Sequence, residues 1–305
     1  MDKIQQNLLE QVAGIHQVPS GAYSLRINGQ LQGKNSSENI EIVSKTDKPG
    51  IDIYIKPGTK NESMHLPVIL SQTGLKELVY NDFHIGEDCD VTIVAGCGIH
   101  NGGDSDSEHS GVHSFYVGKN AKCKYIEKHY GEGDGNGKNV MNPTTYIELE
   151  EGARMEMDTA QIKGVDSTVR DTVAKIGASA TLKVNEKIMT HGEQYAKTNF
   201  TVELIGEDAG AHVISRSVAK DKSVQEFISR VEGKNRCSGH TECDAIIMDD
   251  AVVSAVPQIL AHHTEATLIH EAAIGKIAGE QLIKLMTLGL TEKEAEQEII
   301  NGFLN

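Results

Sequence analysis

Residues 149–190 read LEEGARMEMDTAQIKGVDSTVRDTVAKIGASATLKVNEKIMT and carry the pattern that decides the fold. Twice in this stretch an aliphatic residue is followed four positions later by a small one, as Leu149/Ala153 and Ile176/Ala180. Each pair opens a segment of alternating apolar and polar residues, ARMEMDTAQI and ATLKVNEKIM, which is typical of a β-strand with one buried face. The stretch therefore predicts strands that recur behind a common turn.

The same kind of pair recurs along much of the chain. It is found at Ile85/Cys89, Val117/Ala121, Ile205/Ala209 and Ile247/Ala251. Successive pairs are 32, 32, 27, 29 and 42 residues apart. Periods of this size are typical of a solenoid, in which each coil buries its apolar face only against its neighbours. We predict a mainly β protein, a right-handed parallel β-helix over residues 21–278, with a large antiparallel sandwich as the alternative.

The N-terminal segment shows helical periodicity instead. An amphipathic helix over residues 3–16, ended by Pro19, is predicted. Its apolar residues at helical spacing are Ile4, Leu8, Val12 and Ile15. We assign residues 1–20 to an N-terminal helical arm that either caps the solenoid or contacts a partner.

The C-terminal segment, residues 279–305, predicts two short helices. The first helix ends at Gly289, and a capping box, Thr291 with Glu294, opens the second. Short helices with exposed apolar stripes are unstable alone in water, so these must pack on the solenoid or on a partner. Their apolar residues, the candidate partner-binding residues, are Leu282, Leu285, Met286, Ile299 and Phe303.

Composition limits the functions that are open to the chain. The 305 residues include 44 acidic and 29 basic side chains, a net charge of −15, which should repel nucleic acid and anionic membranes. No apolar run approaches the roughly 18 residues of a membrane helix, and the first residues lack an export signal, so we expect a cytoplasmic protein. In a reducing compartment the five cysteines are expected to be free thiols, metal ligands or small buried residues. They are Cys89, Cys97, Cys123, Cys237 and Cys243.

Two glycine-rich segments invite a functional interpretation. GEGDGNGKN, residues 131–139, departs from both common phosphate-binding patterns. We interpret it as a flexible surface loop, so any ATP would be hydrolysed by another chain. CGIHNGGDSDSEHSGVH, from Cys97 to His113 and including His100, concentrates three histidines and three carboxylates with a cysteine. It is either a metal site or a solvated polar loop.

A third cluster lies near the C-terminal end of the predicted solenoid. Thiolate with imidazole or carboxylate is a ligand set for iron or zinc, although such residues in strands are often part of the core. Adjacent residues of one strand project to opposite faces, so neighbouring ligands there share one centre only at a bulge or a subunit interface. The residues of this cluster are Cys237, Cys243, His262, His263, His270 and Glu271.

The same region carries a family resemblance. TECDAIIMDDAVVSAVPQI resembles a segment of SufB, and HEAAIGKIAGEQLIKLMTLGLTEKEAEQEIINGF resembles the ending shared by SufB and SufD. The resemblance to the SufB/SufD family of iron–sulfur cluster assembly scaffolds covers about residues 80–305. It weakens toward the N-terminus.

The resemblance implies a scaffold that builds an iron–sulfur cluster with SufC, an ABC-type ATPase that binds the C-terminal helices. Cys243 matches the SufB cysteine thought to accept sulfur and hold the cluster, Glu271 matches the SufB glutamate, and His270 matches the histidine supplied by SufD. One chain thus carries both types of residue, which implies a homodimer. Cys237 and His263 are weaker candidate ligands. Iron and sulfur donors and apo recipient proteins are the further partners implied.

The chain departs from bacterial SufB in its length, since it lacks most of the long N-terminal region associated with sulfur delivery. Its proportions resemble minimal two-component systems of one scaffold and one ATPase. Two alternatives stay open: a cluster-free structural partner of the ATPase, like a degenerate SufD, and a β-helix enzyme acting on acidic polysaccharide. The second fits poorly with the charge of −15, the free thiols and the lack of an export signal.

Overall fold

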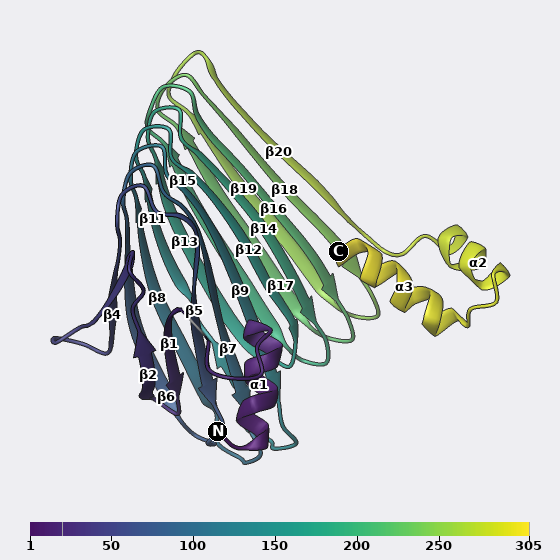
Figure 1. Cartoon of the computed structure of the whole chain (residues 1–305). Helices are drawn as coiled ribbons and strands as arrows, with labels where there is room; N and C mark the ends of the chain where they lie inside the picture. Colours follow the sequence, from purple (N-terminus) through teal and green to yellow (C-terminus); the bar gives the residue numbers. More distant parts are fainter. Residues whose placement is uncertain (20, 305) are drawn as a thin grey trace.

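The computed structural model describes residues 1–19 and 21–304 of the chain. Residues 20 and 305, which bound two of the predicted segments, lie outside the described residues. Two long β-sheets run along the molecule and face each other across one apolar core, with helices at the two ends of the chain (Figure 1). This is a parallel β-solenoid of about eight turns, as predicted.

Sheet A is the first of the two ten-stranded sheets. In spatial order its strands are β2 (Gln30–Asn35), β1 (Ala22–Ile27), β5 (Lys60–Leu70), β7 (Asp90–His100), β9 (Lys122–Glu132), β12 (Arg154–Lys163), β14 (Thr181–Thr190), β16 (Ala209–Ala219), β18 (Cys237–Ile247) and β20 (Ala266–Gly275).

Sheet B is the second. Its strands are β19 (Val252–Ala261), β17 (Val224–Gly233), β15 (Tyr195–Leu204), β13 (Ser167–Ile176), β10 (Asn139–Met141), β11 (Thr144–Leu149), β8 (Ser107–Val117), β6 (Lys76–Ile85), β4 (Gly50–Ile55) and β3 (Ile40–Ser44). The short strands β10 and β11 both lie between β8 and β13.

Each full coil contributes one strand to each sheet, and the chain crosses from one sheet to the other at two corners. The pairings between coils are parallel, while the hairpins β1–β2 and β3–β4 are antiparallel. Parallel pairing between successive coils excludes the antiparallel sandwich. Along each strand alternate side chains point into the core, which is why the apolar residues of the sequence alternate.

The recurring pairs mark one corner, with two corrections. Ile85, Val117, Leu149 and Ile176 are in register at the turn from sheet B to sheet A. The next residue in register is Leu204, not Ile205, which is an extra turn residue with 44% of its surface exposed.

The pair Ile247/Ala251 was wrongly placed in the series, because it lies at the opposite corner, from sheet A to sheet B. The true successor of Leu204 at the first corner is Gly233. From Ile176 to Leu204 is 28 residues and from Leu204 to Gly233 is 29, so the gap of 42 disappears. Both corners use a tight turn with one residue at positive φ, such as Asp208 and Asp249, and this similarity explains the error.

Helix α1 (Lys3–Ala13) packs on the outer face of sheet A, over β5, β7 and β9 (Figure 1). It is shorter than predicted because it ends at Gly14, whose φ of 67° is the left-handed conformation typical of a helix C-terminus, well before Pro19. Leu8 and Val12 are buried as expected, over Gly96 and Gly98, where any larger side chain on the strand would collide with the helix.

The glycine-rich segment 131–139 stacks on the preceding coil. Gly135 N donates to Asn101 O at 3.2 Å and Gly137 N donates to Gly103 O at 2.9 Å. A Cβ on either glycine would lie within 2.3 Å of a backbone oxygen. Close backbone approach between two coils therefore explains the glycines without a bound phosphate.

The two C-terminal helices are present as predicted, α2 (Gly279–Thr287) and α3 (Glu292–Leu304). The capping box is confirmed, since Thr291 N donates to Glu294 Oε2 at 2.8 Å and Glu294 N donates to Thr291 Oγ1 at 3.3 Å. Helix α3 packs against the solenoid through Ile300 and Leu304, which contact Val218 of β16. Helix α2 has no buried residue and stands away from the sheets (Figure 1).

Candidate functional site

The last two strands of sheet A hold the predicted ligands. Strands β18 and β20 are parallel, with Thr241 opposite His270 and Cys243 opposite Ala272. Strand alternation places Cys243 and His270 on the inner face and Glu271 on the outer face. The structure therefore brings Cys243 and His270 to one face of neighbouring strands, and separates Glu271 from both by the sheet.

Cys243 lies inside the solenoid, one strand from its C-terminal end, with 1% of its surface exposed. Burial raises the pKa of its thiol to about 12, and the carboxylates of Glu186 and Asp244 add to the rise. The thiol is therefore protonated at neutral pH. A metal ion or a rearrangement of the end strands must remove the proton before the sulfur can bind as a thiolate.

His270 is half-buried beside Cys243. Its Nδ1 lies 2.7 Å from Thr241 Oγ1. Burial lowers the pKa of His270, and the neighbouring His240 lowers it further. A neutral imidazole held at one nitrogen leaves the other nitrogen available as a ligand.

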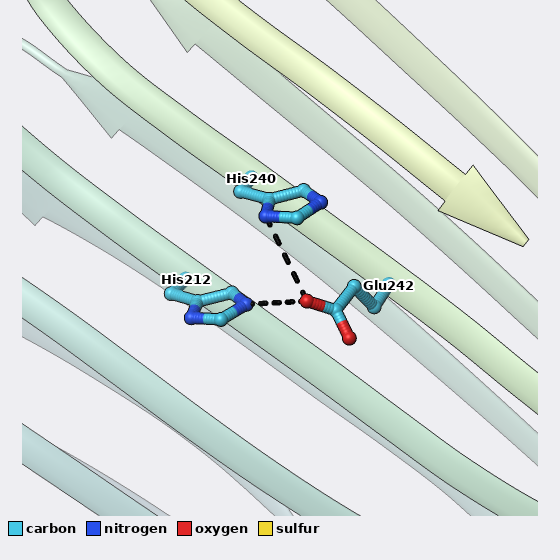
Figure 2. A group of neighbouring side chains, drawn as sticks. All are labelled: His212, His240 and Glu242. Carbon is cyan, nitrogen blue, oxygen red and sulfur yellow. Dashed lines mark hydrogen bonds and ion pairs between the residues drawn. The ribbon is translucent and has the colours of Figure 1, made fainter.

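Glu271 projects outward, with 67% of its side chain exposed, and its Oε2 lies 3.5 Å from His240 Nε2. Glu271 therefore lies in a different group of neighbouring side chains, or constellation, from the one that contains Cys243. Figure 2 shows the centre of that constellation, His212, His240 and Glu242, on the outer face of sheet A. Sequence reasoning missed these three residues, although His212 and His240 are 28 positions apart, which is one coil.

The two weaker candidates lie at a corner of the solenoid. Cys237 is the first residue of β18, and six residues of extended strand place it roughly 20 Å from Cys243. His263 is in the turn before β20, where its Nδ1 accepts from Glu265 N at 3.1 Å. Cys237 and His263 are thus near each other but remote from Cys243 and His270.

A row of buried polar side chains runs through the core toward Cys243. Arg170 of β13 bridges Glu127 of β9 and Glu186 of β14. Glu186 Oε2 accepts from Ser215 Oγ at 2.8 Å, and Ser215 is the register partner of Cys243. Charged residues at the inward positions of apolar strands were the sequence signal that could have revealed this row.

The electrostatics of the row follow from burial. Burial opposes ionisation of Glu127, but the combined interactions of the carboxyl with its neighbours, led by Arg170, outweigh burial and hold its pKa well below the usual range. For Glu186 burial prevails and raises the pKa despite Arg170. His113 and His129 are buried as neutral imidazoles, because burial lowers the pKa of each to about 4.

The segment from Cys97 to His113 is distributed over two strands and a loop rather than gathered round one point. Cys97 and His113 are buried, while Asp106 accepts from Lys138 N at 2.8 Å. Among residues 1–19 and 21–304, the only close group of three or more histidine, cysteine or acidic ligands is the one in Figure 2. The metal interpretation of this segment therefore finds no support in the geometry.

The candidate partner-binding residues divide between the two C-terminal helices. In α2, Leu282 and Leu285 are half-buried and Met286 is exposed. In α3, Ile299 and Phe303 are half-buried, and Phe303 packs against the cluster that anchors α3. The most exposed apolar residues of this region, Ile283 and Leu288, were missed.

No helix among the described residues is both long and apolar enough to cross a membrane.

Comparison with known proteins gives a consistent result. Residues 78–303 match the model of the SufBD core domain of the SUF system for FeS cluster assembly. A SufBD family protein for iron–sulfur cluster assembly from Methanocaldococcus jannaschii is 28% identical over 257 residues, which cover 83% of this chain and 79% of the relative. One from Archaeoglobus fulgidus is 27% identical, covering 89% and 72%, and one from Pyrococcus horikoshii is 26% identical, covering 97% and 84%.

Proposed function

The chain belongs to the SufBD family and has a role in iron–sulfur cluster assembly, and from this premise we propose that it is the scaffold on which a cluster is built. In this proposal two copies of the chain meet at their C-terminal coils and work with a SufC-like ABC-type ATPase. Iron and sulfur come from separate donors, and the finished cluster passes to apo recipient proteins.

The observation that carries the proposal is the position of Cys243 and His270. They lie on the same inner face of neighbouring strands, with Cys243 buried on β18 and His270 on β20, the last strand of sheet A. Thiolate and imidazole together are suitable ligands for iron. Since imidazole binds an iron–sulfur cluster more weakly than thiolate does, such mixed ligation favours release of the product.

The end of the solenoid also supports the homodimer. Strands β19 and β20 are the last strands of their sheets, so each has one unpaired edge. They expose apolar side chains, among them Ile259 and Val256. Unpaired edges beside exposed apolar residues favour pairing with another chain, and a two-fold arrangement of identical copies would bring two Cys243 side chains toward one axis.

Glu271 joins this centre only in the dimer. Within one chain the sheet separates it from Cys243. A carboxylate near the edge of the sheet can be offered to the second copy, and a hard oxygen ligand binds iron–sulfur clusters less strongly than thiolate. In the proposal, Cys243 and His270 hold the cluster and Glu271 is a ligand contributed across the two-fold axis.

Helix α2 is the proposed docking segment for the ATPase. Ile283, Met286 and Leu288 are exposed on it, with 63% of Ile283 and 76% of Leu288 accessible. An amphipathic helix of this kind is a common ligand for a hydrophobic groove. Because α3 anchors the same segment to the solenoid, a movement of the ATPase would be transmitted to the end strands.

The test is anaerobic reconstitution of the full chain with iron and sulfide, followed by absorption spectroscopy and gel filtration. We expect the wild type to retain a cluster in the dimer fraction and Cys243→Ala to lose it. Cys123→Ala is the matched control, since Cys123 is also buried in sheet A and burial also raises its pKa to about 12. Cys237→Ala should retain the cluster if the corner residues take no part.

The outcomes separate two functions. Retention in Cys243→Ala would remove Cys243 from the site. No cluster in any variant, with stoichiometric binding of the ATPase, would instead favour a cluster-free structural partner.

A further inference from the structure

The outer face of sheet A carries a group of side chains that the proposed function does not use as a unit. His212 of β16 and His240 of β18 are direct register partners. Their rings stack with centroids 5.0 Å apart and planes 3° from parallel. Glu242 is two residues beyond His240 on the same strand and therefore projects from the same face, with its carboxylate beside the edges of the two rings (Figure 2).

The distances suit a shared ion. Glu242 Oε1 lies 2.8 Å from His212 Nε2 and 3.7 Å from His240 Nδ1, and one ligand atom from each residue lies within 4.8 Å of the others. Two ligands that are each about 2.1 Å from a tetrahedral ion are roughly 3.4 Å apart. Rotation of the two imidazoles out of their parallel stack, so that a lone pair of each ring points at one position beside Glu242 Oε1, would convert the group into a coordination site.

A second observation concerns the other nitrogen of His240. His240 Nε2 is buried without a hydrogen-bond partner, and Glu271 Oε2 lies 3.5 Å from it as an ion-pair partner. Histidines that bind metals generally donate their second ring N–H to a carboxylate, which selects the tautomer and orients the ring. With the proton on Nε2 facing Glu271, the Nδ1 lone pair of His240 faces Glu242 and a bound ion.

The surroundings favour a cation. Asp244 projects from the same face of β18 as Glu242, and Glu271 adds a further negative charge. Lys183, the register neighbour of His212 on β14, has its Nζ 3.7 Å from Glu156 on the far side. The three central residues are only half-buried, so an ion can reach them from solvent.

We propose that His212, His240 and Glu242 bind one divalent transition-metal ion of the Fe²⁺ or Zn²⁺ class, and that Glu271 is the positioning residue for His240. Two imidazoles with one carboxylate are characteristic of non-haem iron(II) and of catalytic zinc sites, in which water fills the remaining positions. Cys243 projects from the opposite face of the sheet, so the three metal ligands are separate from Cys243 and His270, and Glu271 is the one residue that this site shares with the proposed cluster site.

The experiment is an anaerobic titration of the full chain with Co²⁺, a spectroscopic substitute for both ions, in wild-type and Cys243→Ser proteins. We expect one equivalent to bind in both proteins, with visible d–d absorption and no thiolate-to-cobalt charge-transfer band. Competition by Zn²⁺ and by Fe²⁺ then shows which ion the site prefers. A charge-transfer band that disappears in Cys243→Ser would report binding at the thiol instead.

Substitutions locate the site. His240→Asn and Glu242→Gln should abolish stoichiometric Co²⁺ binding, while Glu271→Gln should weaken it roughly tenfold or more, since an orienting carboxylate is lost but no ligand. His84→Asn is the matched control: His84 is also stacked in a row of rings on an outer face, between Tyr54 and Tyr116, and its loss should leave binding unchanged.

Absence of stoichiometric binding in the wild type would overturn the proposal, as would binding that survives in both His240→Asn and Glu242→Gln. Affinity unchanged in Glu271→Gln would remove the positioning role of Glu271 alone. Circular dichroism of each variant establishes that the solenoid is intact.

Discussion

The two ends of the solenoid are built differently. At the N-terminal end each sheet finishes in an antiparallel hairpin, β1–β2 in sheet A and β3–β4 in sheet B. Strand β2 has the mostly polar sequence QLQGKN. At the C-terminal end each sheet finishes in a long parallel strand, β19 or β20, whose exposed side chains include Val252, Val256, Ile259 and Ile269.

The difference shows how one chain can resist pairing with other molecules at its N-terminal end, the closed end, and allow such pairing at its C-terminal end, the open end. An edge strand that is short and polar resists pairing with other molecules, whereas a long apolar edge invites it. The candidate ligands Cys243 and His270 lie at the open end, while helix α1 and the hairpins lie at the closed end. The C-terminal end is therefore the end at which the proposed dimer would form.

The largest effect on the unfolding free energy is expected at Arg170, in the row of buried polar side chains that lies between the two ends. Arg170→Leu leaves Glu127 and Glu186 buried without their cation, which should cost about 3–5 kcal/mol of unfolding free energy. Urea unfolding with hydrogen exchange measures the loss and shows whether the two ends then unfold separately, as a one-dimensional stack of coils allows. Arg236→Ala, which removes an exposed pair with Glu207 and Asp208, should cost less than about 1 kcal/mol. Equal costs for the two variants would contradict the assignment.

At the closed end, Leu8→Ala should destabilise the protein without changing its oligomeric state. Leu8 is fully buried between α1 and β7, and removal of a buried leucine costs about 2–5 kcal/mol. Chemical denaturation measures the cost, and sedimentation analysis measures the oligomer. Ile4→Ala in the first turn of the same helix, where 39% of the side chain is exposed, is the control. A change in oligomeric state with Leu8→Ala would show that α1 takes part in association.

At the open end the opposite result is expected. Ile259→Lys places a charge among the exposed apolar residues of β19 and should raise the dissociation constant of the proposed dimer roughly 100-fold. Because Ile259 faces inward beside Val231, the effect on the unfolding free energy of the monomer is measured separately by urea unfolding. Leu31→Lys on β2 is the control at the other end. Sedimentation equilibrium measures the dissociation constant of each variant. An unchanged constant for Ile259→Lys would place the interface elsewhere.

The smallest expected effect is a dependence of the unfolding free energy on pH, which arises from His113 in β8. Burial lowers the pKa of His113 to about 4 from an ordinary value of 6.5. The unfolded chain therefore binds a proton that the folded chain does not, and stability falls as the pH drops below about 6.5. His113 alone should account for about 1 kcal/mol between about pH 7.5 and about pH 5.5. His113→Asn should flatten the fall in the urea midpoint, and an identical pH dependence in the variant would argue against a neutral buried His113.

Local sequence patterns predicted the strands and helices, whereas packing determined how these are arranged in space. The alternation in ARMEMDTAQI and the capping box at Thr291 depend on neighbours in the sequence, and both are confirmed. The corner at Ile247/Ala251 was misassigned because two corners of opposite direction share the same local turn. Only the register of the sheets distinguishes them.

The candidate site divides in the same way. The resemblance implied that Cys243, His270 and Glu271 serve one centre, and strand alternation predicted that adjacent ligands reach one centre only at a bulge or a subunit interface. The structure has His270 inward and Glu271 outward along β20. His212 and His240 were not recognised as neighbours, because one coil of chain separates them and only the ladder brings their rings together.

By itself the sequence determined a parallel solenoid, its helical ends and membership of the SufBD family, since periodicity and motifs depend only on the order of residues. The tertiary structure alone decided which end is open, which charges are buried and which side chains share a face. Those properties depend on the stacking of one coil on the next, where residues about 28 positions apart become neighbours and a shift of one residue exchanges the core for the surface.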